Sequence, residues 1–370
     1  MQTEGSLKKL KIKLVLFRSD FKVAPFLFKR FSNPLLIMNK LILLAGFICV
    51  ANLTFAQKTT GIHLLNTYHI ASAGSWDYLE ANFGDKIYVT HGSQVNILNK
   101  STGDSAGFIA NTNGVHGVAF DVAQGKGFTS NGRTNNVSVF DIKTNKVLTQ
   151  IATGQKPDAI IYEPFSKKII TCNGRSSSLS IIDPIKNILV DSINVGGGPE
   201  TVVSDEEGKI YVNIEDKNEI VVIDAKTFKV INHWSVAPGK GPTGLAIDKK
   251  TKRLFAGCEK LLVILDANTG KVIDKIKIGD GCDGVAFDVS TKNIFTSNGE
   301  GTMSVIHEEN KDKFNLIENI VTKKGARTIS LDTKTHLLYL PTADFEPTDS
   351  KSKGRPKMIT GSFQVLVFGK

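Results

Sequence analysis

The sequence predicts an all-β protein, a seven-bladed β-propeller that is closed by pairing of its N- and C-terminal strands. Three observations lead to this prediction: a repeat of roughly 42 residues, four short apolar runs in each repeat, and no long helical periodicity after Ala56. The chain has 370 residues, of which 41% are hydrophobic and 8% aromatic, so it is able to bury a large core.

The repeat is clearest in the pentapeptide GVAFD, which occurs at Gly117–Asp121 and again at Gly284–Asp288. Five weaker copies follow the same pattern and end on Asn82, Glu163, Asp205, Asp248 and Asp332. The seven copies are 39 to 44 residues apart, so they define one period. We expect their terminal acidic residues to form turns rather than a site.

Each repeat continues, after a short polar turn, with a second predicted strand. These strands are KIYVT (86–90), KGFTS (126–130), KIITC (168–172), KIYVN (209–213), RLFAG (253–257), NIFTS (293–297) and HLLYLP (336–341). A third run, such as NVSVFD, and a fourth, such as KVLTQIAT, complete the unit. Runs rich in Val, Ile and Phe between Gly, Asn, Asp and Lys are typical of strands and hairpins. Four strands in every unit predict propeller blades, and the nearly continuous apolar runs predict sheets covered on both faces.

The seventh unit reaches Lys370 after only three strands. We expect the missing outer strand to come from HLLNTYHI (63–70), which precedes the first unit. This exchange of a strand between the two ends of the chain closes the ring and removes two free sheet edges.

Most of the net charge of +10 lies near the N-terminus. Residues 1–40 contain nine lysines and arginines and two acidic residues, so they carry +7, which leaves about +3 for residues 57–370. This small charge weakens the prediction of a general affinity for nucleic acids or membranes.

Residues 38–56 are predicted to be a signal peptide. A short basic start at Met38 precedes an uncharged run that ends before Gln57 with the small residues that a signal peptidase reads. Residues 1–37 lie upstream of this signal and are interpreted as a misassigned extension. We expect one exported domain, residues 57–370, that is periplasmic or secreted, monomeric and without a membrane span after cleavage. An uncleaved N-terminal anchor is the alternative.

Cysteine usage is compatible with export. Cys49 is expected to leave with the signal peptide, so Cys172, Cys258 and Cys282 remain, and an odd number allows at most one disulfide. Cys258 and Cys282 fall on top loops of adjacent units, and a bridge between them would fit a redox accessory role. Two unpaired core cysteines are the alternative. The sequence has no C-x-x-C-H motif, which excludes a c-type cytochrome, and no phosphate loop.

The repeats also resemble a known family. The stretch GVAFD…KGFTSNGRTNNVSVFDIKTNKVLTQIATGQKPDAI is similar to the YncE-type, or YVTN-repeat, seven-bladed propellers of bacteria. KIYVT and KIYVN are close to the signature that names the family, and LLYLPTADFEP with GSFQVLVFGK resembles its closing blade. The resemblance covers residues 61–370 and implies an exported propeller. Members are associated with single-stranded DNA, surface layers or periplasmic redox pathways, but likeness of fold assigns none of these roles.

Propeller geometry predicts two rings of polar side chains at the top of the central channel. The first ring follows the entry to strand one of each blade and comprises Trp76 with Asp77, His116, Asp158, Glu200, Thr243, Asp283 and Arg327. The second ring lies at the end of strand two and comprises His91, Asn131, Asn173, Asn213, Cys258, Asn298 and, roughly, Asp344. Polar groups that converge in a concavity are the default ligand-binding site, so we predict a funnel here.

The second ring contains a recurring pentapeptide: TSNGR (129–133), TCNGR (171–175) and TSNGE (296–300). Asn-Gly is a strong hairpin signal because both residues tolerate positive φ. The asparagines are therefore either ligand-binding groups of the rim or residues that only turn the chain. His91 and His116 have the same two interpretations, as site residues or as half-buried hydrogen-bonded histidines.

We predict a binding or scaffold protein rather than an enzyme and assign no catalytic residue. Its ligand is expected to be a small molecule, glycan or peptide. Contacts would come from Arg133, Arg175, Arg327, Trp76 and the loop Thr342–Thr360. Arginine and aromatic residues together also suit single-stranded DNA, which is one alternative. The acidic residues of the first ring oppose it because they repel phosphates.

A metal-dependent hydrolase is the other alternative. Six-bladed lactonases hold a divalent ion with Glu, Asn and Asp at the channel mouth, and similarity in residue type implies a comparable site here. The oxygen ligands would be Asp158, Glu200, Asn213 and Asp283, with Asn173 beside them. His91 or His116 would act as the base. A divalent metal is the only cofactor that these residues suggest.

Overall fold

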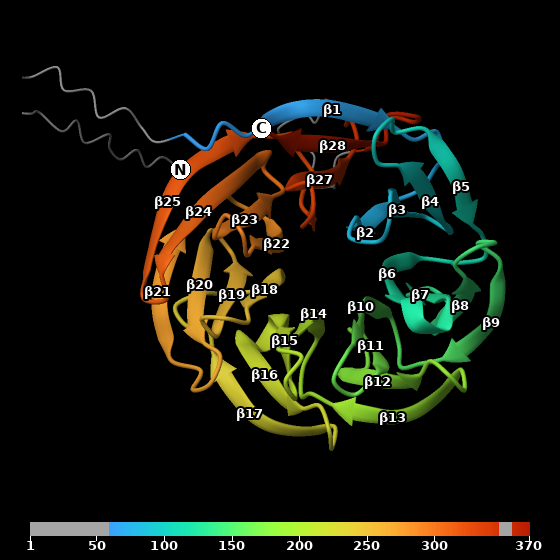
Figure 1. The fold of residues 1–370 in the computed structure, drawn as a ribbon, viewed down its shortest axis with the longest axis horizontal. Helices are drawn as coiled ribbons and strands as arrows, with labels where there is room; N and C mark the ends of the chain where they lie inside the picture. Colours follow the sequence, from blue (N-terminus) through green and yellow to red (C-terminus); the bar gives the residue numbers. More distant parts are fainter. Residues whose placement is uncertain (1–58, 348–356) are drawn as a thin grey trace, which may run out of the picture. The chain divides into compact units, whose positions relative to one another are not determined.

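Seven four-stranded antiparallel sheets are arranged in a ring, as predicted (Figure 1). The structure, a computed structural model, describes residues 59–347 and 357–370, which lie in the compact unit Gln57–Lys370. The predicted extension 1–37 and signal peptide 38–56 lie outside the described residues. We number the blades 1 to 7 in chain order and give the strands of each from the axis outward.

The first four blades follow one another along the chain. Blade 1 consists of β2 (Trp76–Glu80), β3 (Lys86–His91), β4 (Gln94–Asn99) and β5 (Ser105–Ile109). Blade 2 consists of β6 (Val115–Asp121), β7 (Lys126–Asn131), β8 (Asn136–Asp141) and β9 (Val147–Ala152). Blade 3 consists of β10 (Pro157–Glu163), β11 (Lys168–Asn173), β12 (Ser178–Asp183) and β13 (Ile188–Asn194). Blade 4 consists of β14 (Pro199–Ser204), β15 (Lys209–Ile214), β16 (Glu219–Asp224) and β17 (Lys229–Ser235).

The remaining blades complete the ring. Blade 5 consists of β18 (Leu245–Asp248), β19 (Arg253–Cys258), β20 (Leu261–Asp266) and β21 (Val272–Lys277). Blade 6 consists of β22 (Cys282–Asp288), β23 (Asn293–Asn298), β24 (Thr302–Asn310) and β25 (Lys313–Val321). Blade 7 consists of β26 (Ser330–Asp332), β27 (Leu337–Thr342), β28 (Gln364–Gly369) and, outermost, β1 (His63–His69).

The closing strand of blade 7 comes from the other end of the chain. β1 pairs antiparallel with β28, from His63 opposite Gly369 to His69 opposite Gln364. The prediction that HLLNTYHI completes the last blade is therefore confirmed. Tyr68 anchors this strand, because its ring is buried between blades 7 and 1 and its hydroxyl donates a 2.8 Å hydrogen bond to the Lys100 carbonyl oxygen of blade 1.

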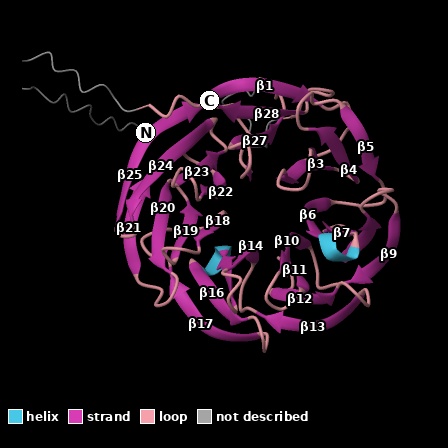
Figure 2. Ribbon diagram, in the orientation of Figure 1, coloured by secondary structure: helices cyan, strands magenta, loops and turns pink. Residues whose placement is uncertain are grey.

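Helix is almost absent from the described residues (Figure 2). The helical elements of the described residues are two short 3₁₀ turns, η1 (Val122–Gln124) and η2 (Glu215–Lys217). None of the described helices has the length and apolar character needed to cross a membrane. η1 follows the acidic end of β6, where the Asp121 carboxylate accepts a hydrogen bond from the Gln124 N–H. The Asp288 carboxylate likewise accepts a bond from the Ser290 N–H, so these repeated acidic residues hold turns, as expected.

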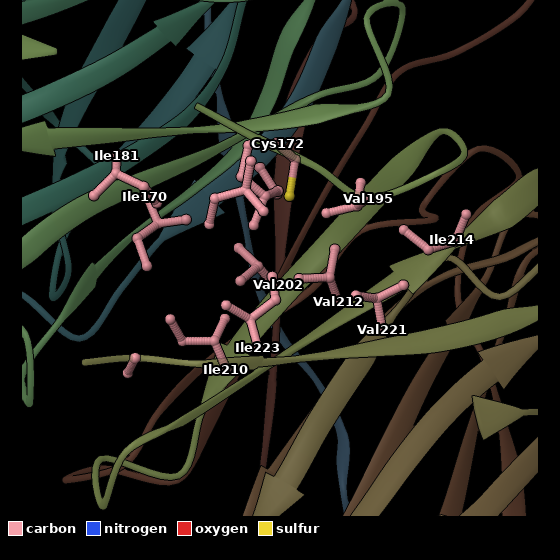
Figure 3. Packing of buried hydrophobic residues seen from close by; sticks show 14 residues of the cluster. Ile170, Cys172, Ile181, Val195, Val202, Ile210, Val212, Ile214, Val221 and Ile223 are labelled. Carbon is pink, nitrogen blue, oxygen red and sulfur yellow. The ribbon is translucent and has the colours of Figure 1, made fainter. Parts of the chain in front are cut away.

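The hydrophobic core is divided among the seven interfaces between neighbouring blades. Figure 3 shows the cluster between blades 3 and 4, in which Ile170 and Cys172 pack near Val202 and Val212. The third residue of each second strand is large and almost fully buried: Tyr88, Phe128, Ile170, Tyr211, Phe255, Phe295 and Tyr339. Each sheet thus has both faces covered by neighbours, which explains the continuous apolar runs in the sequence.

Candidate functional site

A cavity of about 920 Å³ is lined by residues of all seven blades. We call it the funnel. Every residue of the predicted first ring lines the funnel: Trp76, Asp77, His116, Asp158, Glu200, Thr243, Asp283 and Arg327. The position after the strand-one entry therefore reaches the same concavity in every blade.

β-Bulges in the inner strands accompany this ring. In blade 2, Val115 pairs with Asn131 and Val118 pairs with Thr129, so β6 has one residue more than β7 in this interval. The extra residue falls in the stretch that contains His116. Equivalent register shifts bracket Asp77, Asp158, Glu200 and Asp283. Because a bulge changes the direction of a side chain relative to regular alternation, it lets the ring residue face the funnel while the rest of the strand packs in the blade.

Hydroxyl groups of one blade hold the backbone of the ring in the next blade. The Ser130 hydroxyl donates to the Asp158 carbonyl oxygen, and the Ser297 hydroxyl donates to the Arg327 carbonyl oxygen. Thr328 donates in the same way to the Asp77 carbonyl oxygen at 2.7 Å. The ring is thus built on rigid strands that are tied across the blade interfaces.

Charged ring residues form one connected group on the side of blades 1 to 3. His116 Nδ1 lies 2.5 Å from Asp77 Oδ2 and 3.4 Å from Asp158 Oδ1. Lys156 Nζ lies 3.3 Å from the other Asp158 oxygen, Oδ2. One imidazole therefore stands between two carboxylates, and one of these is also paired with a lysine.

Arg327 extends this group toward blade 6. Its Nε lies 2.6 Å from Asp283 Oδ2, and its Nη2 lies 3.4 Å from Asp77 Oδ1. On the opposite side, the Glu200 and Glu215 carboxylates form neither a hydrogen bond nor an ion pair with any described residue, and both line the funnel. The funnel thus combines a group of paired charges with two carboxyl groups that have no hydrogen-bonded or ion-paired partner among the described residues.

The environment shifts the pKa values of the ring. Burial, together with the nearby Asp158 charge, raises the pKa of Glu200 to about 9. Burial also raises the pKa of Asp283 to about 6, against the lowering effect of Arg327. Burial alone would lower the pKa of His116, but the Asp77 hydrogen bond and the Asp158 charge raise it above its ordinary value. The carboxyl groups of Glu200 and Asp283 therefore hold their protons more tightly than they would in water.

The predicted second ring does not line the funnel. His91, Asn131, Asn173, Asn213, Cys258 and Asn298 are fully buried, and Asp344 pairs with Lys323 outside the funnel lining. The Asn131 amide donates to Ser138 Oγ at 2.8 Å in its own blade, and Asn173 donates to Ser180 Oγ at 3.0 Å. The Asn131 and Asn173 side chains thus point toward the third strand of their own blade. The prediction that the second ring lines the funnel is therefore corrected.

His91 is buried for a different reason. Its ring stacks on Phe363 at 3.9 Å, while Nδ1 and Nε2 lie 2.6 Å from Ser72 Oγ and 2.7 Å from the Gly74 carbonyl oxygen. Both nitrogens are thus occupied, and burial lowers the pKa of His91. It is the hydrogen-bonded interior histidine that the sequence left open, whereas His116 is the one that lines the funnel.

The Asn-Gly pair is not the left-handed part of its turn. In the turns that follow β7 and β11 the residues with positive φ are Asn135 (53°) and Ser177 (50°), four residues after Asn131 and Asn173. Gly132 has another purpose, since a Cβ there would lie 2.7 Å from His116 Nε2. The absence of a side chain at Gly132 therefore leaves room for the His116 imidazole.

The arginines that follow the Asn-Gly pair, Arg133 and Arg175, are exposed and do not line the funnel. Trp76 does line it, and its indole lies against Phe363 at 5.3 Å and Phe345 at 6.1 Å. Of the predicted aromatic and arginine contacts, Trp76 and Arg327 are therefore the two that reach the funnel.

The predicted metal ligands Asp158, Glu200, Asn213 and Asp283 are not brought together as one group. Asn213 is buried and donates to the carbonyl oxygens of Thr243 and Gly244, and Asp283 is paired with Arg327. The described residues instead bring Asp77, His116 and Asp158 together, with one ligand atom of each within 4.8 Å of the others.

Cys258 and Cys282 are free thiols in the structure, which agrees with two unpaired core cysteines and not with a bridge between them. Cys258 packs between blades 4 and 5, whereas Cys282 packs between blades 5 and 6. The sheet of blade 5 separates the two sites. Burial raises the pKa of Cys258 to about 12 and raises that of Cys282 as well, as expected for inert core thiols.

Several funnel residues escaped the sequence prediction. Lys156 stands two residues before Asp158 in the same strand entry, so its proximity could have been inferred. Glu215 comes from η2, beyond the end of β15, and the sequence carries no signal that brings its side chain to the funnel. Phe345 and Met358 belong to the loop Thr342–Thr360, which was predicted to supply contacts, although the sequence did not single out these two residues.

The fold and this site define a seven-bladed β-propeller with a polar, highly charged funnel. No protein-family model matches the chain, and no curated protein matches it. Among solved structures, it is similar to a chain described as hydrazine synthase of Kuenenia stuttgartiensis, with a TM-score of 0.63 and 15% sequence identity. The match covers 78% of this chain and 95% of that chain. At this identity the likeness shows the fold alone.

Proposed function

We propose that this protein is a binding protein that takes a small polar molecule in the funnel. One observation carries this proposal: every blade contributes at least one residue, in its inner strand or just before it, to the same cavity of about 920 Å³. The blades repeat one four-stranded pattern, yet at the ring they present carboxylate, imidazole, hydroxyl and guanidinium groups. Chemically different groups that meet at one ring of a repeated scaffold are what a specific site requires.

The chemistry of the funnel favours a ligand with a positively charged or hydrogen-donating group. Glu200 and Glu215 face the funnel without an ion pair among the described residues. The hydroxyls of a sugar, or an ammonium group whose charge displaces the Glu200 proton, would pair with them. Trp76 and Phe345 add an apolar wall, which suits the carbon skeleton of the same molecule.

A thermal-shift screen of the purified protein tests this function. Its probes are polyamines, lysine-containing short peptides, neutral oligosaccharides and single-stranded oligonucleotides. We expect a polyamine, peptide or sugar to raise the melting temperature, and we expect Glu200→Ala to abolish that rise. Glu219→Ala is the matched control, because this glutamate lies on β16 and pairs with His233. A rise that survives Glu200→Ala would locate binding elsewhere and overturn the proposal.

Single-stranded DNA is the less favoured ligand. Asp77, Asp158, Glu200 and Asp283 lie where phosphates would have to enter, and Arg133 and Arg175 are directed elsewhere. A shift by oligonucleotides that weakens steeply with added salt, together with no response to the other probes, would favour DNA instead.

Hydrolysis is a second candidate function, and the pair of His116 with Asp77 favours it. An imidazole oriented by a carboxylate is the usual form of a general base, and Glu200 holds its proton to a high pH, as a general acid must. Assays of the purified protein with lactone and ester substrates test this function. Turnover that His116→Ala abolishes would support it, and no turnover above that of the variant would exclude it.

We also propose that the chain is an exported member of the YncE-type propellers. The repeats and the sequence of residues 38–56 support this proposal. N-terminal sequencing of the native protein is expected to begin at Gln57. A native N-terminus before Met38 would contradict both the signal peptide and the assigned start.

A further inference from the structure

We propose that Asp77, His116 and Asp158 form a binding site for a divalent transition-metal ion such as Zn²⁺, with open coordination positions facing the funnel. The three side chains come from blades 1, 2 and 3, and one ligand atom of each lies within 4.8 Å of the other two. One imidazole nitrogen with two carboxylate oxygens is a donor set for Zn²⁺ or Mn²⁺, since Ca²⁺ and Mg²⁺ prefer oxygen ligands alone.

The spacing of the ligand atoms fits a single ion. Two ligand atoms bound tetrahedrally at zinc distances lie about 3.4 Å apart. His116 Nδ1 is 3.4 Å from Asp158 Oδ1, and it is 2.5 Å from Asp77 Oδ2. The shorter distance is a hydrogen bond, which an ion would replace by moving the two groups apart by roughly 1 Å.

The surrounding groups orient both carboxylates toward one point. Arg327 Nη2 lies 3.4 Å from Asp77 Oδ1, and Lys156 Nζ lies 3.3 Å from Asp158 Oδ2. Each carboxylate therefore has one oxygen beside a cation and the other beside His116 Nδ1. This is the arrangement in which outer partners fix the orientation of metal ligands.

The backbone that carries the ligands is held as firmly as the side chains. Ser130 and Thr328 bind the carbonyl oxygens of Asp158 and Asp77 across the blade interfaces. Asp158 is only 4% exposed, and the absence of a Cβ at Gly132 leaves the His116 ring its position. A site with fixed ligands loses little conformational entropy when the ion binds.

Three protein ligands leave positions for water or for an oxygen atom of a funnel ligand. Such a metal would bind anionic or hydroxyl oxygen at blades 1 to 3, while Glu200 and Glu215 would face the opposite end of the same molecule. The metal site deepens the proposed function but is tested with the metal alone. Loss of the metal site would leave binding of organic probes at Glu200 to be judged separately.

Titration calorimetry of the chelator-treated protein with Zn²⁺, Mn²⁺ and Ca²⁺ is the test. We expect one Zn²⁺ per chain, bound more tightly than Ca²⁺, and a loss of affinity of at least about 100-fold in His116→Ala. His233→Ala is the matched control, because His233 also pairs with a carboxylate, Glu219, at 2.9 Å but has only one acid beside it. We expect this variant to bind Zn²⁺ as the wild type does.

Asp158→Asn keeps the test decisive if His116→Ala fails to fold. Visible absorption of bound Co²⁺ gives a second readout, since its intensity and position report the ligand set. We expect the Co²⁺ spectrum to be lost in both funnel variants and retained in His233→Ala. Absence of Zn²⁺ binding in the wild type, or equal binding in the folded His116→Ala variant, would overturn the proposal.

Discussion

The side-chain hydroxyl of Ser130 in blade 2 donates a hydrogen bond to the backbone carbonyl oxygen of Asp158 in blade 3. Ser297 in blade 6 makes the equivalent bond to Arg327 in blade 7. The serine of the TSN motif thus fixes the point at which the next blade enters the funnel. This role is distinct from both turn formation and ligand binding, the two roles that the sequence offered for the motif.

Replacing this serine is expected to weaken the blade interface. Ser130→Ala leaves the Asp158 carbonyl oxygen and the Gly117 N–H, which lies 2.9 Å from Ser130 Oγ, without their partner. We expect the free energy of unfolding in urea to fall by about 1–3 kcal/mol. Ser166→Ala is the control, because its buried hydroxyl has no hydrogen-bond partner among the described residues. Equal costs for the two variants would contradict the inter-blade role.

Closure of the ring predicts that a single residue of β1 matters for the whole domain. Tyr68 is 7% exposed and packs between blades 7 and 1, so Tyr68→Ala is expected to cost about 3–5 kcal/mol of unfolding free energy. Leu64→Ala, on the same strand but 49% exposed, is expected to cost less than about 1 kcal/mol. Chemical denaturation with a single transition monitors both. A small cost for Tyr68→Ala would show that the other blades are stable without closure.

A buried carboxyl group on β24 predicts a dependence of stability on pH. Glu308 is 1% exposed, and burial, with the charge of Asp248 adding to it, raises its pKa to about 7. The folded state therefore holds this proton more tightly than the unfolded chain, whose glutamates titrate near about 4.3. Stability from this group is present at low pH and is lost as the pH rises from about 4.3 to about 7.

Glu308→Gln, which stays neutral, is expected to remove that slope. Near pH 8 the variant should be more stable than the wild type, by at most on the order of 3 kcal/mol, whereas near pH 4 the two should be alike. Urea unfolding across this range measures the effect. Glu207→Gln, at a residue whose side chain is 69% exposed, should retain the wild-type slope. A wild-type slope in Glu308→Gln would refute the assignment.

Removing Arg327 is expected to move the titration of its partner. Burial raises the pKa of Asp283 to about 6, and the Arg327 guanidinium, 2.6 Å from Asp283 Oδ2, acts in the opposite direction. In Arg327→Gln the pKa of Asp283 should therefore rise above about 6, which carboxyl-carbon NMR measures directly. Lys260→Gln breaks an exposed pair with Asp280 and should leave Asp283 unchanged. An unaltered Asp283 in Arg327→Gln would mean that the pair contributes no net interaction.

The cysteines are expected to be unreactive in the native protein. Cys172, Cys258 and Cys282 are buried free thiols, and burial raises the pKa of each. Because the thiolate is the reactive form, iodoacetamide should modify them only after unfolding. Peptide mass spectrometry without reduction should find no cross-link between Cys258 and Cys282. A cross-linked peptide from the native protein would restore the disulfide interpretation.

The fold could be predicted because the same signals are written seven times. No single run, such as KIYVT (86–90), distinguishes a propeller from a sandwich. The regular spacing of the residues that end strand one identifies a propeller. The strand missing from the last unit then indicates that residues 63–70 complete it. A weak copy such as TISLD can be assigned to strand one because its spacing matches that of the clear copies.

The site was only partly predictable, and the difference has a geometric reason. The first ring lies at a fixed offset from a fixed strand entry, so Asp77 and His116 could be placed without knowledge of the neighbours. The direction of the Asn131 side chain depends on the alternation along β7 and on the bulge in β6. The position of that bulge cannot be predicted from the sequence. Whether Cys258 and Cys282 are bridged stayed open in the sequence for the same reason, since sequence distance does not reveal the face of a sheet.

The pairing of β1 with β28 means that the ring closes only after the last strand has been synthesised. Residues 63–69 leave the ribosome hundreds of residues before residues 364–369, so the first strand of the domain has no partner during nearly all of its synthesis. An interrupted chain keeps an unpaired edge and an uncovered Tyr68, which are features that promote aggregation and degradation. Only a chain that contains β28 can pair β1 and close the ring, so a chain that stops before β28 cannot complete the fold.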